Sequence, residues 1–82
     1  MLPKIKELKV LDNFILQVSF DDNKTVLYNV KEDIDTIPSY KALETEIGLF
    51  NTAGVDTSRT VVEWTKDIDL PSDIIYEHGT AI

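Results

Sequence analysis

The feature that most constrains the fold is a period of two in the residues from position 14 onward. In an extended chain, one face would carry Phe14, Leu16, Val18 and Phe20, and the other Ile15, Gln17 and Ser19. This period predicts a strand with one face on a core. We expect the first of these faces to be the more buried.

A turn cluster follows this strand. The segment Asp21-Asp22-Asn23-Lys24 contains Asx residues, which tolerate left-handed backbone and favour tight turns. The period of two resumes at positions 26, 28 and 30, so residues 14–30 predict an antiparallel hairpin that turns near Asp22-Asn23. Apolar residues at positions 5, 8 and 10 precede a break at Asp12-Asn13. The first 30 residues therefore predict an antiparallel three-strand meander.

Short helices are expected in the middle of the chain. Residues 31–34 fit one helical turn, and Pro38 prevents that helix from continuing. A second short helix is expected from a cap at Ser39 to Gly48. Its apolar face would contain Tyr40, Leu43 and Ile47. Residues 51–58 predict a loop anchored by Val55.

The last third of the chain predicts one further strand and a terminal helical segment. Residues 60–64 contain the single tryptophan, and we expect this strand to join the first sheet with Trp64 in the core. Pro71 fits the first turn of the terminal helix, and Asp69 is a candidate cap. With 82 residues, the chain predicts a single small α+β domain over residues 1–82.

No residue pattern predicts catalysis or a cofactor. The three glycines are too scattered for a phosphate-binding loop, and His78 is the only histidine. Asp67, Asp69 and Asp73 lack the ligand spacing of a calcium loop, so turn and capping roles explain them. The acid pairs at positions 33 and 35, and 44 and 46, are expected on solvated faces. We therefore expect no enzymatic activity, no cofactor and no bound metal.

The chain has neither an apolar run of membrane-spanning length nor a signal-peptide pattern. Together with the absence of cysteine, this predicts a cytoplasmic protein without membrane contact. The net charge of −7 is uneven: residues 1–30 hold four lysines and four acids, whereas residues 31–82 hold four basic and eleven acidic side chains. With a single arginine, direct binding of nucleic acid is disfavoured.

Two functions from different classes fit these observations. The first is a non-enzymatic domain that binds a basic protein through Glu44, Glu46 and Asp67. The second is a small-ligand or enzymatic domain with a pocket formed between subunits and lined by Tyr28, Trp64 and Tyr76. Acidity that only maintains solubility is the plain alternative to a basic partner. A homodimer is expected because a small sheet without disulfides is stabilised when a second copy covers its edge.

The order of these features resembles the bacterial family called domain of unknown function 2442, from about residue 3 to residue 76. The features that carry the resemblance are Phe20-Asp21-Asp22, Tyr28-Asn29-Val30, Leu49-Phe50, the strand ending in Trp64, Asp69-Leu70-Pro71 and Ile75-Tyr76. The family usually has glycine in the first hairpin turn and after the tryptophan strand. This chain has Asn23 and Lys66-Asp67 near those places, and Asn and Asp tolerate similar backbone.

The resemblance implies no established activity or catalytic residue. It does imply associated domains and neighbouring proteins, because some family members look fused to a helix-turn-helix domain and others lie beside a small toxin-like family. Since this chain ends soon after Tyr76, we expect no DNA-binding module in it. An antitoxin-like or accessory role would then be exercised through protein contact.

Overall fold

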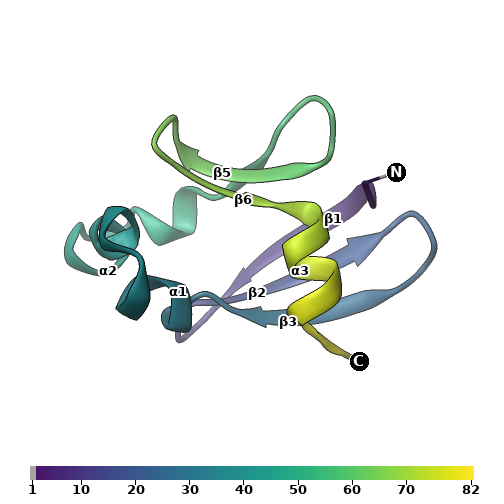
Figure 1. Ribbon diagram of the computed structural model, residues 1–82, viewed down its shortest axis with the longest axis horizontal. Coiled ribbons are helices and arrows are strands. Elements are labelled where there is room, and N and C mark those ends of the chain that lie inside the picture. The colour runs from purple at the N-terminus through teal and green to yellow at the C-terminus, as the bar shows by residue number, and fades with distance from the viewer. Residues whose placement is uncertain (1) are drawn as a thin grey trace.

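Two antiparallel sheets enclose the core of the protein, whose computed structural model describes residues 2–82 (Figure 1). The first sheet has the strand order β1-β2-β3-β7, with β1 at Ile5–Leu11, β2 at Ile15–Phe20, β3 at Thr25–Asn29 and β7 at Thr80–Ala81. The second has the order β4-β5-β6, with β4 at Gly54–Val55, β5 at Val61–Thr65 and β6 at Ile68–Pro71. This arrangement confirms the predicted α+β class.

Short helices connect and flank the sheets. They are α1 (Lys31–Thr36), the 3-10 turn η1 (Pro38–Lys41), α2 (Ala42–Thr45), the 3-10 turn η2 (Phe50–Thr52) and α3 (Ser72–His78). In Figure 1, α1 and α2 lie together on the left, whereas α3 lies on the right, beside the first sheet. The C-terminal helix therefore lies away from the middle helices.

The predicted meander is confirmed, including its register. Leu16 pairs with Tyr28 and Val18 pairs with Val26 across the hairpin. Leu16, Val18 and Phe20 are almost fully buried, whereas Ile15, Gln17 and Ser19 are half-buried. Phe14 departs from the prediction, because it lies in the turn before β2 with a left-handed φ of 62° and is only half-buried. Asn23 adopts a left-handed φ of 71°, so it can replace the family's usual turn glycine. Lys66 and Asp67 have no positive φ, and the second turn needs no glycine.

The predicted place of the tryptophan strand was wrong. Strand β5 pairs with β4 and β6 in the second sheet instead of extending the first. Alternation identifies the buried face of a strand, but it does not identify the strand's neighbour. Pro71 ends β6 with extended backbone and precedes the helix, and Asp69 pairs with Glu63 in the sheet instead of acting as a cap.

The middle helix is shorter than predicted. It ends at Thr45, Glu46 is extended, and Gly48 has a left-handed φ of 82°. Ile47 is fully exposed and does not continue the apolar face. Ser39 is not a cap, because Pro38 begins the 3-10 turn and no side chain caps it. Thr45 and Ile47 are β-branched and are weak helix formers at the end of a short segment.

Trp64 is part of the core, as predicted. Its side chain is 9% exposed and stacks on Phe50, with 5.9 Å between ring centroids. Its Nε1 donates a hydrogen bond to the Phe50 carbonyl oxygen at 3.0 Å. The same buried cluster includes side chains from both sheets and Ile75 of α3. One continuous core therefore holds the two sheets and α3 together.

Candidate protein-binding site

The three aromatic residues predicted to share a pocket lie apart within one copy of the chain. Tyr28 lines a hollow at the edge of β3, Trp64 borders a hollow beside β4 and β5, and Tyr76 lines a third hollow beside α3. A single copy therefore brings none of the three together.

Tyr28 has a structural partner. Its hydroxyl donates a hydrogen bond to Asp33 Oδ2 at 2.6 Å, which ties β3 to α1. Burial, followed by this contact with Asp33, raises the pKa of the Tyr28 phenol. His78 is exposed at the rim of the same hollow, which has a volume of about 620 Å³. This geometry explains Tyr28 as a link between two elements.

The acids predicted to meet a partner differ in their surroundings. Glu44 accepts hydrogen bonds from the ammonium groups of Lys31 and Lys41, which lower the pKa of the Glu44 carboxyl to about 2. Its charge is therefore compensated within the chain. Glu46 and Asp67 are both exposed, and no ion pair joins either of them to another residue within 2–82.

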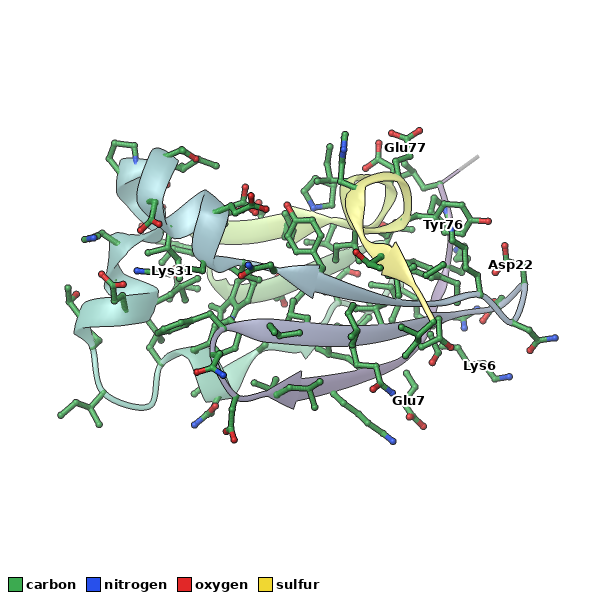
Figure 2. All side chains as sticks on the ribbon, turned by 90° about the horizontal axis from the view of Figure 1, so that it is seen from below. Lys6, Glu7, Asp22, Lys31, Tyr76 and Glu77 are labelled. Atoms are coloured by element: carbon green, nitrogen blue, oxygen red, sulfur yellow. The ribbon has the colours of Figure 1, made fainter. Side chains whose placement is uncertain are left out.

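The hollow beside α3, which we call the α3 hollow, has a volume of about 830 Å³. Apolar side chains line part of it: Leu2, Pro3, Phe20 and Tyr76. Four acids also line it: Asp21, Asp22, Asp73 and Glu77, with Lys4 as the single basic residue of the lining. Figure 2 shows Tyr76 and Glu77 of α3 near Asp22 of the β2–β3 turn, at one end of the molecule.

Hydrogen bonds hold the segment before β1 against α3. The buried Ser72 hydroxyl donates to the Pro3 carbonyl oxygen at 2.7 Å, over 69 positions of sequence. The Asp21 N–H donates to the Lys4 carbonyl oxygen at 3.0 Å. These two contacts fix the N-terminal wall of the hollow relative to α3 and to the β2–β3 turn.

Tyr76 is fixed by contacts on several sides. Its hydroxyl donates to Asp22 Oδ2 at 2.5 Å, and its ring meets Phe20 edge-on at 5.0 Å between centroids. Lys24 Nζ lies 4.0 Å from the centre of the Tyr76 ring and donates to the Tyr76 carbonyl oxygen at 3.2 Å. The ring is thus already in contact with one cation, as expected for a cation–π interaction.

The acids of the α3 hollow differ in whether their carboxylates already have partners within the chain. Asp21 pairs with Arg59 through two hydrogen bonds of 3.0 and 2.9 Å. The pKa of Asp22 is lowered, chiefly by the hydrogen bond from Tyr76 and then by the Lys24 N–H. Asp73 and Glu77 form no ion pair with any residue from 2 to 82. Asp73 Oδ1 accepts only a backbone hydrogen bond, from the Ile74 N–H at 3.0 Å. No basic side chain among the described residues therefore pairs with these two acids, which are four positions apart on α3.

Sequence reasoning named Tyr76 but missed the acids around it. The α3 hollow combines residues 2–4, 20–22 and 73–77, and no local pattern reports that these segments meet. The i, i+4 spacing of Asp73 and Glu77 was the available signal, since it places both acids on one face of a helix.

Within residues 2–82, no group of three or more histidine, cysteine, aspartate or glutamate side chains is arranged to hold a metal ion. Across the same residues, every helix is too short or too polar to cross a membrane.

Comparison with known proteins gives one match. Residues 5–81 match the sequence model of the family described as "Protein of unknown function (DUF2442)", so the chain belongs to this family. No curated protein and no solved structure matches the chain.

Proposed function

We propose that this member of the DUF2442 family is a non-enzymatic docking domain that binds a basic segment of another protein in the α3 hollow. The observation that carries the proposal is the combination of an apolar lining, including Leu2, Pro3 and Tyr76, with two acids, Asp73 and Glu77, that form no ion pair within residues 2–82. Such a surface suits a partner that is itself apolar and cationic.

Lysine and arginine side chains have this dual character. Their apolar stems pack on hydrophobic surface while the charged head remains near water or an acid. In the α3 hollow, a stem would contact Pro3 and Tyr76, and the head would reach the carboxylates of Asp73 or Glu77. The excess of acids in residues 31–82 would also attract a basic protein over longer distances.

The biological role that follows is an accessory or antitoxin-like one, exercised by contact with a basic partner. The exposed acids Glu46 and Asp67 do not line the α3 hollow, so we do not assign them to this contact. Glu44 is a weaker candidate than predicted, because two lysines already surround its carboxylate.

Co-purification from the native host at endogenous expression level tests this proposal. The wild-type chain is compared with the double variant Asp73→Asn/Glu77→Gln, and the matched control is Glu46→Gln. We expect a basic protein to co-purify with the wild type and the control but to be lost with the double variant. Retention of every co-purified protein by the double variant would contradict the proposed site.

A further inference from the structure

Strand β1 is an edge of the first sheet that remains open along most of its length. It pairs with β2 on one side, and the opposite edge of the sheet is the two-residue strand β7. Among residues 2–82, another segment forms a backbone hydrogen bond with the outer side of β1 only at its start, where the Ile5 N–H donates to the Arg59 carbonyl oxygen at 2.7 Å. An open seven-residue edge strand is a template for pairing with another chain.

The direction of the backbone groups follows from the register of the sheet. The Phe20 N–H donates to Lys24, toward β3, so the even-numbered residues of β2 direct their backbone groups to β3. The odd-numbered residues of β2 then face β1, where they pair with Glu7, Lys9 and Leu11. The N–H and C=O groups of Leu8 and Val10 therefore point to the open side.

The charges along β1 select one way of pairing with a second copy. Charged side chains on an edge strand usually prevent pairing, because like charges meet. In an antiparallel pair centred on Leu8, however, Glu7 of each copy lies opposite Lys9 of the other. Centring the pair on Glu7 or on Lys9 would instead bring two like charges face to face, which is unfavourable.

The side chains on both faces of β1 fit this register. Lys9 Nζ and Glu7 Oε1 form an ion pair of 3.6 Å within one copy, but the two side chains are 58% and 59% exposed, so a second copy can reach both of them. Leu8 and Val10 are only half-buried, and they pack against the core from the inner face. A second strand beside β1 would shield them further from water.

We propose that the open edge of β1 is a self-association surface, on which two copies pair antiparallel about a twofold axis at Leu8 with Glu7 of each facing Lys9 of the other. This proposal does not depend on the binding of a basic partner. The α3 hollow contains Lys4 but no residue of β1, so the two surfaces are separate.

Sedimentation equilibrium of charge variants tests both the association and its register. Glu7→Lys places lysines opposite lysines, and Lys9→Glu places glutamates opposite glutamates, so each variant alone should dissociate roughly tenfold more readily than the wild type, or more. An equimolar mixture of the two variants should regain association, because every facing pair is then opposite in charge. The double variant Glu7→Lys/Lys9→Glu should also associate like the wild type.

A wild-type chain that remains monomeric at high micromolar concentration would overturn the proposal. So would a mixture of the two single variants that associates no better than either variant alone. Circular dichroism of each variant checks that the fold is retained, since both side chains are exposed.

Disulfide formation provides a second readout of the register, because the chain has no cysteine of its own. Leu8→Cys should form a disulfide-linked dimer on mild oxidation, since facing Cα atoms in an antiparallel pair are within disulfide reach. In the matched control Leu11→Cys, the two sulfurs would be separated by about 20 Å of strand and should not link. Faster linkage of Leu11→Cys than of Leu8→Cys would contradict the Leu8 register.

Discussion

The hydroxyl of Tyr76 donates a hydrogen bond to Asp22 Oδ2 at 2.5 Å, joining α3 to the β2–β3 turn across 54 positions of sequence. This contact lowers the pKa of Asp22 and raises that of Tyr76, because it favours the carboxylate and the neutral phenol. Two walls of the α3 hollow are therefore held together by one charged hydrogen bond.

Tyr76→Phe tests this contact, since it keeps the ring on Phe20 and removes only the hydroxyl. The folded-state pKa of Asp22 lies below its ordinary value of 3.8, so its ionised form stabilises the protein above that pH and the effect is lost as pH falls. We expect Tyr76→Phe to unfold at lower urea concentration than the wild type at pH 7. The difference should shrink below pH 3.8, and a difference independent of pH would contradict the assignment.

The contribution of Glu44 to the stability of the fold also depends on pH. Hydrogen bonds from Lys31 and Lys41 lower its pKa from 4.5 to about 2, so its stabilising effect is complete above pH 4.5 and is lost toward pH 2. Glu44→Gln should lower stability at pH 7 and reduce proton uptake on unfolding near pH 3 by up to about one proton. The control Glu46→Gln, in an exposed side chain outside this network, should leave the acid unfolding curve unchanged.

Trp64→Ala should reduce the free energy of unfolding by about 3–5 kcal/mol, because it removes a buried ring that stacks on Phe50. Chemical denaturation measures this loss. Ile47→Ala is the matched control: its side chain is fully exposed, so the change should stay within about 0.5 kcal/mol. A loss below about 1 kcal/mol for Trp64→Ala would show that the indole is not part of the core.

Gly79 allows a close approach between the end of α3 and β3. A Cβ at this position would lie 2.7 Å from the Ile75 carbonyl oxygen and 2.9 Å from the Val26 side chain. Gly79→Ala should therefore destabilise the protein by about 1–3 kcal/mol. Gly54→Ala is the control, because no atom lies within 4 Å of the added Cβ and its φ is not positive. Equal stability of the two variants would argue against this packing.

The local features of the fold were accessible from sequence because they repeat along the chain. The period of two in residues 14–30 specified which side chains face the core, and burial of Leu16 and Val18 confirmed it. The Asx-rich turn predicted a left-handed residue, which Asn23 supplies. A burial pattern was sufficient for these statements, since none of them depends on a distant segment.

The arrangement of distant segments was not accessible. Strand β6 has four residues and β7 has two, which is too short for a period to be recognised. Likewise, Tyr76 was identified as a site candidate, but its partner Asp22 and the hollow between them depend on tertiary packing. Exposure of Ile47 shows the opposite case, in which a local helical pattern extended beyond the helix that formed.

The rate of association with a purified basic partner tests the docking proposal most directly. Stopped-flow rates would be measured for the wild type, for Asp73→Asn/Glu77→Gln, and for the controls Glu46→Gln and Asp67→Asn, from low to physiological ionic strength. Exposed charges more than about 8 Å apart are screened at physiological salt, so the wild-type rate should fall as salt increases. We expect the double variant to associate more slowly and with a weaker salt dependence than either control. A partner that binds the double variant at the wild-type rate, with equal dependence on salt, would contradict the assignment of the α3 hollow.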